Sequence, residues 1–328
     1  MSERTTVGLR PWLPWPLCDS PWWTQPVRAE RLAALRIGVA IMLLVDVFTL
    51  YLPHADAFFG RDSLGSPEVF APSALSLRWS LLRGVESPAA VTGVFVVWAV
   101  SATLLLLGVL PRFSALVAWA LSVSVIGING YVHNSGDNVR NIELFYLMLC
   151  PCAAVWSFGV ARPESSKGVL SACFTPFEDS GRATQLSGSP IYVHAWPLRL
   201  LFVQLMIIYF FNGVYKSLGS HWREGDVMHY VVCNLAWTRF SYAQLPLPFP
   251  VIQLLTWSTL IWELGFPLLV MIPLTRKPAL WMGIGFHVGT AISLQLCAFP
   301  MYMICMYLPL IPWEQYVDSW RRRGVSVV

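Results

Sequence analysis

The sequence predicts an all-α protein, a polytopic membrane helical bundle of about eight transmembrane helices with interfacial helices beside them. Three observations predict this class. Hydrophobic residues make up 56% of the 328 residues and charged residues only 12%, whereas a soluble domain carries about 25% charged residues. The mean hydropathy is +0.57. The chain also contains 16 Trp and 11 Tyr, and both residue types favour the membrane–water interface.

Apolar runs long enough to span a bilayer recur along the chain. A bilayer core accommodates roughly 20 apolar residues as a helix. Such runs predict spans at 32–52, 89–110, 113–132, 142–160, 197–218, 250–273, 279–296 and 299–313. The last two runs are short and are separated by only a few residues around Cys297 and Ala298, so they could instead form a re-entrant hairpin.

The segments between the apolar runs are of two kinds. Segments 58–86 and 227–247 mix apolar and charged residues, which predicts helices lying at the membrane interface. Segment 165–189 is polar and rich in Ser and Gly, which predicts a loop. The predicted organisation has three parts: an N-terminal Pro- and Trp-rich segment (1–27), a transmembrane domain (28–314) and a basic cytoplasmic tail (315–328).

The distribution of Lys and Arg predicts the orientation. With a cytoplasmic N-terminus, the cytoplasmic segments carry a basic excess of roughly two to one. This bias predicts a multi-pass protein of the cell membrane with both termini in the cytoplasm. The lipid bilayer is its expected environment. Nucleic acid is not an expected partner, because the net charge is only +4 and the basic residues are scattered between apolar runs.

Sequence motifs of familiar soluble enzymes are absent. The chain has no Walker loop, no His-Glu-x-x-His, no Gly-x-Ser-x-Gly and no dinucleotide fingerprint. Its seven cysteines include no Cys-x-x-Cys pair. His133, His221, Asp226 and His229 have a spacing that fits no familiar metal-binding pattern, so no metal site is predicted.

A first group of polar residues surrounds the end of the predicted span 197–218. Lys216 lies near the non-cytoplasmic end of this helix, and Gly213 shares its face at a spacing of three residues. A lysine partly removed from water can act as a base or nucleophile. The alternative is a lysine that extends its ammonium group to the membrane boundary. His221, Trp222, Asp226 and His229 follow within a few residues.

A second group, His133, Asp137, Asn138, Arg140 and Glu143, lies on the same predicted side of the membrane. Three of these residues, Asp137, Arg140 and Glu143, can share one helix face because they are three residues apart. The alternative is a helix-capping loop with an ion pair on the surface.

A third group lies inside predicted spans: Asp46, Glu263 and His287. A charged group at that depth usually faces a partner or a watery cavity. Glu263 and His287 are expected to face the bundle interior and could pair with each other. The alternative is a structural hydrogen bond between helices.

Several stretches resemble one known membrane family. The stretch from Tyr209-Phe-Phe-Asn-Gly-Val-Tyr-Lys216 to Trp222-Arg-Glu-Gly225 resembles the HTTM (horizontally transferred transmembrane) domain, the membrane part of vitamin K-dependent gamma-carboxylase and of many bacterial relatives. The resemblance extends over about 28–314. Further stretches that agree are Phe58-Phe59-Gly60-Arg61-Asp62 with Leu64-Gly65, 145–157 ending in Trp156-Ser157, Trp262-Glu263-Leu264-Gly265, and Phe286-His287.

The resemblance implies a bundle of about eight helices and a role for Lys216. In the carboxylase, a lysine at this position deprotonates the vitamin K hydroquinone. The oxygenated vitamin then abstracts a proton from a substrate glutamate, and the carbanion takes up carbon dioxide. The carboxylase has Asn-His-Ser at the entrance to its fourth span, where this chain has Asn134-Ser135-Gly136 and its histidine earlier, at His133. Carboxylation of a protein substrate is therefore not expected.

These observations lead to three functional hypotheses. The first is an enzyme that acts on a lipid or a quinone at the non-cytoplasmic face, a reduced quinone such as vitamin K being implied only by the resemblance. The second is a non-catalytic protein for peptide or toxin maturation or for partner binding. The third is a small-solute transporter. The catalytic candidates are Lys216, His133, Asp137 and Asn138. The substrate-binding candidates, expected in the same pocket, are Tyr209, Asn212, Gly213, His221, Trp222, Asp226, His229, Glu263 and His287.

Overall fold

The computed structural model describes residues 22–23, 25–59, 63, 80–82, 85, 87–128, 133–158, 190–240, 243–244 and 246–323. Helices dominate these residues, which confirms the predicted all-α class. The chain divides into two compact units. Unit 1 comprises Met1–Gln25 and His194–Gln295, and unit 2 comprises Pro26–Val193 and Leu296–Val328. Most of the predicted interfacial segment 58–86 and all of the predicted loop 165–189 lie outside the described residues.

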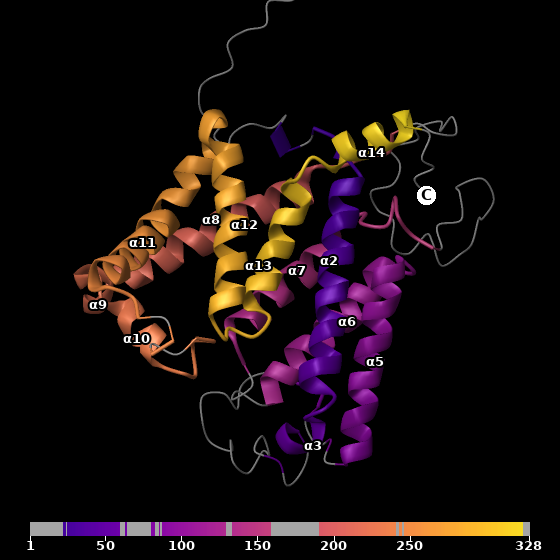
Figure 1. Ribbon diagram of the computed structural model, residues 1–328. Helices are drawn as coiled ribbons and strands as arrows, with labels where there is room; N and C mark the ends of the chain where they lie inside the picture. Colours follow the sequence, from indigo (N-terminus) through magenta and orange to yellow (C-terminus); the bar gives the residue numbers. More distant parts are fainter. Residues whose placement is uncertain are drawn as a thin grey trace, which may run out of the picture. The chain divides into compact units, whose positions relative to one another are not determined.

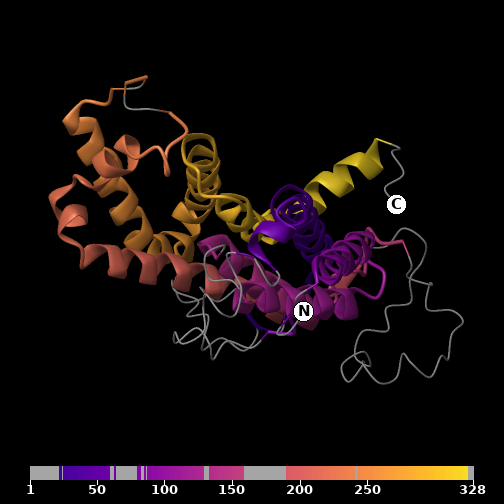
Figure 2. The same cartoon turned by 90° about the horizontal axis from the view of Figure 1, so that it is seen from below.

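Unit 2 is built around helix α2 (Glu30–Asp46), which continues into the short π-helix η1 (Val47–Tyr51). Helix α2 packs against α5, α7 and α13, while α6 packs against both α5 and α7 (Figure 1, Figure 2). Strands β1 (Val27–Arg28) and β2 (Tyr192–Val193) pair in antiparallel fashion. The other elements are α3 (Ala55–Phe58), α5 (Pro88–Leu107), α6 (Pro111–Ile128), α7 (Ser135–Leu149), α13 (Phe299–Tyr307), η5 (Leu308–Leu310) and α14 (Trp313–Arg322).

Helix α14 covers much of the segment predicted as a basic C-terminal tail (315–328). It begins at Trp313 and ends at Arg322. Two ion pairs hold it to the start of α2: Arg28 with Asp318, and Arg31 with Glu314. A hydrogen bond to Glu30 also raises the pKa of the Arg28 guanidinium above its ordinary value.

Unit 1 consists of two long apolar helices and their neighbours. Helix α8 (Trp196–Ser217) packs along α11 (Phe249–Met271), and α11 packs against α12 (Pro273–Ser293) (Figure 1). Two short helices, α9 (Ser220–Glu224) and α10 (Val227–Cys233), lie against α11. The predicted interfacial helix 227–247 is therefore wrong in its extent, because the helix ends at Cys233 and a turn follows.

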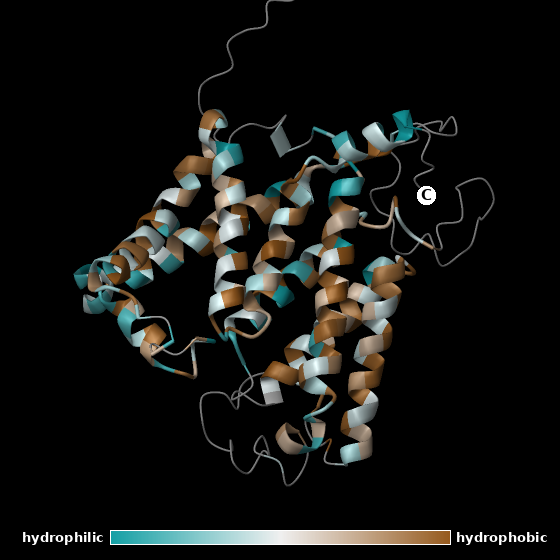
Figure 3. Ribbon diagram, viewed as in Figure 1, coloured by the Kyte–Doolittle hydropathy of each residue, from teal (hydrophilic) through white to brown (hydrophobic). Residues whose placement is uncertain are grey.

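Proline marks the beginning of most of the long helices. The first or second residue is proline in α5, α8, α11, α12 and α13. Proline suits this position because its missing N–H would have no partner inside the helix and its fixed φ favours the first turn. Figure 3 shows α5 as predominantly hydrophobic along its length, as expected for a helix surrounded by lipid and protein.

Within the described residues, four helices are long and apolar enough to cross a membrane. They are Glu30–Tyr51 and Pro88–Leu107 in unit 2, and Trp196–Ser217 and Phe249–Met271 in unit 1. Shorter apolar helices occupy Pro111–Gly127 and Phe299–Leu310. The predicted span 142–160 is wrong in its boundaries, because α7 begins at Ser135 and ends at Leu149. The total of about eight spans stays a prediction.

Candidate functional site

The site in unit 1 depends on a close approach between α8 and α11. A β-carbon placed on Gly213 would lie 2.9 Å from the backbone nitrogen of Leu264, which is closer than real β-carbons come to such an atom. Glycine is therefore required for this helix spacing. The space left by the missing side chain is occupied by Leu264 of α11.

Lys216 lies one turn beyond Gly213, in the last turn of α8, and forms an ion pair with Glu263 of α11. Its Nζ is 2.5 Å from Oε1 of Glu263. The carboxylate is almost buried, with 7% of the side chain exposed, whereas 25% of the lysine side chain is exposed. The ammonium also lies 4.8 Å from the centre of the Trp222 ring. Lys216 is therefore partly desolvated, as predicted, but it has a charged partner.

Glu263 and His287, which could have paired with each other, each have another hydrogen-bond partner. Glu263 bonds to Lys216, and Nε2 of His287 shares a hydrogen bond of 2.7 Å with the hydroxyl of Tyr209. Both residues are buried, which confirms that they face the interior. The two pairings arise because Tyr209 and Lys216 lie two turns apart on the same face of α8.

Aromatic rings enclose the Tyr209 side of the site. The ring centre of Tyr209 lies 4.2 Å from that of Phe266 and 6.2 Å from that of Trp262. Among the described residues, the indole N–H of Trp262 and the Oε2 atom of Glu263 are buried without a hydrogen-bond partner. A buried polar atom without a partner is costly, so these two atoms offer polar contacts inside an otherwise apolar region.

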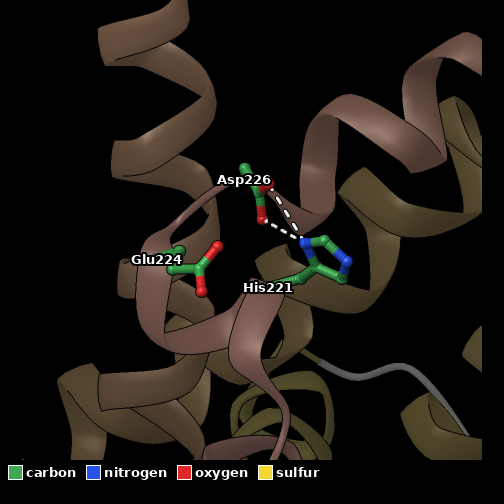
Figure 4. Close-up of side chains that lie close together, drawn as sticks. All are labelled: His221, Glu224 and Asp226. Carbon is green, nitrogen blue, oxygen red and sulfur yellow. Dashed lines mark hydrogen bonds and ion pairs between the residues drawn. The ribbon is translucent and has the colours of Figure 1, made fainter.

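The loop after α8, which includes the short helix α9, brings together three residues that could hold a metal ion. One ligand atom from each of His221, Glu224 and Asp226 lies within 4.8 Å of the others. The Nδ1 atom of His221 donates to both carboxylate oxygens of Asp226, at 3.0 and 3.1 Å, and Glu224 lies beside them (Figure 4). Sequence reasoning considered His221 and Asp226 but missed Glu224, although its position two residues before Asp226 was the available signal.

A second glycine fixes this loop against α11. Gly225 has φ = +84°, a left-handed conformation, and an added β-carbon would lie 2.7 Å from the ring of Trp257. The Trp257 indole N–H in turn donates to the backbone oxygen of Arg223 at 3.2 Å. The position of His221 and Asp226 is therefore tied to α11 by packing as well as by sequence proximity.

Two predicted binding residues, Asn212 and His229, have local contacts in their own helices. The amide of Asn212 donates to the carbonyl of Ile208 in its own helix, and its side chain is exposed. His229 lies in α10, where its ring nitrogens are 3.8–3.9 Å from the Sγ atom of Cys233. Both contacts are with residues of the same helix.

The other catalytic candidates belong to unit 2, at the beginning of α7. His133 Nε2 and the amide oxygen of Asn138 are 3.2 Å apart in an exposed contact. Asn134 and Asp137 form a capping box, in which each side chain bonds to the backbone of the other residue's turn. The predicted helix cap is thus confirmed. A pocket that combines these residues with Lys216 stays a prediction.

The predicted surface ion pair near Asp137 is wrong, because the pair is buried. Arg140 is 0% exposed, and its guanidinium lies 2.9 Å from Asp137 and 3.2 Å from Asp46. Tyr302 donates to Asp46 at 2.7 Å, and Tyr51 donates to Asp137 at 3.0 Å. Asp46 therefore has the partner that its depth in α2 required.

The apolar helices and the charge pairs buried between them define an integral helical membrane protein. Residues 183–313 match the family model described as the HTTM domain, which confirms the predicted family resemblance over that stretch. The match contains α8 to α13 and therefore every residue of the Lys216 cluster. No curated protein and no solved structure matches the chain.

Proposed function

We propose that this HTTM protein is an enzyme that acts on a lipid or a quinone, with Lys216 as its base, at the non-cytoplasmic end of α8. One observation carries the proposal: an amine and a carboxylate, Lys216 and Glu263, meet between two apolar helices while the amine keeps a quarter of its surface exposed. The carboxylate is buried, and the amine is exposed enough for a substrate hydroxyl to reach it.

The chemistry follows from the surroundings of the pair. In a medium of low polarity, the ionised form of an amine–carboxylate pair is less favoured over the neutral form than it is in water, because both ions lose hydration. A bound apolar substrate that excludes water therefore favours transfer of the Lys216 proton to Glu263. The neutral amine then accepts a proton from the substrate hydroxyl: the O–H bond breaks, its electron pair stays on oxygen, and the new N–H bond restores the ammonium.

Neighbouring side chains support an aromatic or amphiphilic substrate. The Trp222 ring lies beside the Lys216 ammonium, and a flat ring system can stack on an indole at this position. The partnerless oxygen of Glu263 and indole N–H of Trp262 are polar groups in an apolar wall, the combination that is usual at small-molecule sites.

A specific observation also favours the second candidate, a non-catalytic protein for peptide or toxin maturation or for partner binding. Lys216 stands in the last turn of α8, where the helix dipole stabilises a cation. In this second candidate, the Lys216–Glu263 pair has a structural role and holds α8 against α11. The described residues add no specific observation in favour of small-solute transport, the third candidate.

Deprotonation of a reduced naphthoquinone tests the proposed base directly. The purified full-length protein in detergent is titrated anaerobically with the hydroquinone, and formation of its anion is followed by absorbance. We expect anion formation with the unmodified protein and none with Lys216→Ala. Lys216→Arg should also give none, because a guanidinium does not release its proton.

A matched control separates this effect from loss of a surface charge. Lys277 is an exposed lysine in the same unit, and Lys277→Ala should form the anion as the unmodified protein does. Equal anion formation in Lys216→Ala and the unmodified protein would overturn the catalytic proposal and leave the binding role.

A further inference from the structure

Unit 2 contains a buried carboxyl group that no described residue satisfies. Glu143 lies in α7, on the face that packs into the unit, and is 0% exposed. Neither of its carboxyl oxygens has a hydrogen-bond partner among the described residues. The other buried carboxylates described in this unit each have a cationic partner. Asp46 and Asp137 face Arg140 and accept from a tyrosine, and Glu30 pairs with Arg28.

The nearest cation along the helix does not bond to Glu143. Arg140 lies one turn before it, but the Nε atom of Arg140 donates to Ser122 at 2.8 Å and its two terminal nitrogens face Asp46 and Asp137. The rings of Tyr51, Trp98 and Tyr302 surround the same guanidinium at 5.1–5.8 Å. The Nη2 atom approaches Asp137 without a hydrogen bond among the described residues, and Glu143 is not among the groups that pair with this guanidinium.

No other described element packed against α7 supplies a positive partner. On α2, Arg36 donates to the backbone oxygens of Leu105, Leu106 and Trp156. On α13, the thiol of Cys305 is the titratable group that interacts electrostatically with Glu143, and it carries no positive charge. On α6, Arg112 lies at the start of the helix and interacts with Cys150 and Cys152, at the end of α7 away from Arg140.

The charge balance of the core also opposes ionisation of Glu143. With Arg140 positive and Asp46 and Asp137 negative, the network around the guanidinium already carries one net negative charge. An ionised Glu143 would add a second negative charge about 4.5 Å further along the helix axis, three residues at 1.5 Å each. It would also cost several kcal/mol of lost hydration, and no described residue supplies a counterion to offset that cost.

We propose that Glu143 is a proton-binding site in the core of unit 2, where it holds a proton as a neutral carboxylic acid. The ligand class is the proton itself. This site is separate from the Lys216 cluster, which belongs to unit 1, and the inference does not depend on the proposed enzyme activity. The site holds one proton inside an apolar bundle. Loss of that proton would place a negative charge next to the Arg140 network.

Infrared spectroscopy of the full-length protein in detergent tests this proposal. A protonated carboxyl group has a carbonyl band above the amide and carboxylate bands, and the band shifts in heavy water. We expect this band in the unmodified protein at neutral pH and its loss in Glu143→Gln. Because glutamine is neutral and of similar size, the variant should unfold at the same temperature as the unmodified protein.

Two further variants keep the test decisive. Glu314→Gln removes a carboxylate that is ion-paired with Arg31; it should reduce the carboxylate band and leave the acid band intact. Glu143→Met, which has no hydrogen-bonding group to satisfy, serves if glutamine prevents folding, and should also lack the acid band. If Glu143→Gln or Glu143→Met instead loses a carboxylate band and retains the full acid band, Glu143 is ionised and the proposal is wrong.

Discussion

The two units handle buried charge in different ways. In unit 2, the Arg140 guanidinium is fully buried and meets two carboxylates, a serine hydroxyl and three aromatic rings. In unit 1, Lys216 meets one carboxylate and one ring and keeps 25% of its side chain exposed. An arginine always remains charged, whereas a lysine can lose its proton. The closed network is suited to holding helices together, and the open pair is suited to chemistry.

A buried polar residue in a membrane bundle can have a structural role or a functional role, and the two units illustrate one of each. Depth alone marks both sites, because charged groups are costly in hydrocarbon and persist where they have a partner or a function. The number of partners distinguishes them. Arg140 is fully buried among two carboxylates and three rings, whereas the Lys216–Glu263 pair has one partner on each side and an amine that is a quarter exposed.

The largest expected effect is the loss of Arg140. Arg140→Ala leaves Asp46 and Asp137 buried without their cation, which should cost about 3–5 kcal/mol. The measurement is the unfolding temperature of the purified protein in detergent, together with its accumulation in the membrane. Arg140→Lys should recover only part of the loss, because an ammonium cannot reproduce the fork of a guanidinium. Full stability of Arg140→Ala would contradict the description of this network as structural.

A smaller effect is expected at the helix contact that positions Lys216. Gly213→Ala places a β-carbon 2.9 Å from the Leu264 backbone, and such overpacking should cost about 1–3 kcal/mol. It should also weaken anion formation by Lys216, because α8 and α11 must move apart. Gly285→Ala in α12 is the matched control, since no atom lies within 4 Å of its added β-carbon. Equal stability of the two variants would show that α8 and α11 separate easily.

Local sequence signals predicted the helices well where nothing but apolar length was needed. The predicted span 89–110 begins one residue after the observed start of α5 at Pro88, and the predicted helix-capping loop before α7 is observed at Asn134 and Asp137. The span predicted from 279 begins six residues too late, because α12 starts at Pro273, the last residue of the preceding predicted span. The start of α7 was predicted seven residues too late, because polar residues such as Asp137 and Arg140 precede the apolar run that defined the span. These residues are buried against other helices, and counting apolar residues cannot recognise polar groups that pair inside a bundle.

Partners distant in the chain were the least predictable part of the site. Lys216 and Glu263 are 47 residues apart and Tyr209 and His287 are 78 apart, so their pairing depends on the register between α8, α11 and α12. Depth in a span correctly indicated that Glu263 and His287 face the interior. It could not indicate which of the buried groups each would meet, because that choice is made by helix packing at Gly213.

The smallest expected change in stability concerns the Lys216–Glu263 pair itself. Lys216→Met removes one partner, but the lysine is partly exposed and the remaining carboxyl can take up a proton, so the loss should be only about 1–2 kcal/mol after allowance for solvent screening. The same variant should abolish deprotonation of the naphthohydroquinone. A small loss of stability with a complete loss of activity is the pattern of a functional pair, opposite to that expected at Arg140.

Exchanging the two charges separates the structural role of this pair from its role in chemistry. Lys216→Glu combined with Glu263→Lys restores an ion pair between α8 and α11, so the unfolding temperature of the double variant should exceed that of either single variant. Its amine, however, starts from the buried position of Glu263, whereas the exposed position next to Trp222 now holds a carboxylate. Deprotonation should therefore stay absent although the fold recovers.

If the double variant recovers both stability and deprotonation, the position of the amine is unimportant. If it recovers neither, the pair has a packing role that a reversed ion pair cannot fill. Recovery of stability without activity is the result that places the base on α8, where the amine is accessible, and leaves to α11 the sheltered carboxylate that holds its proton.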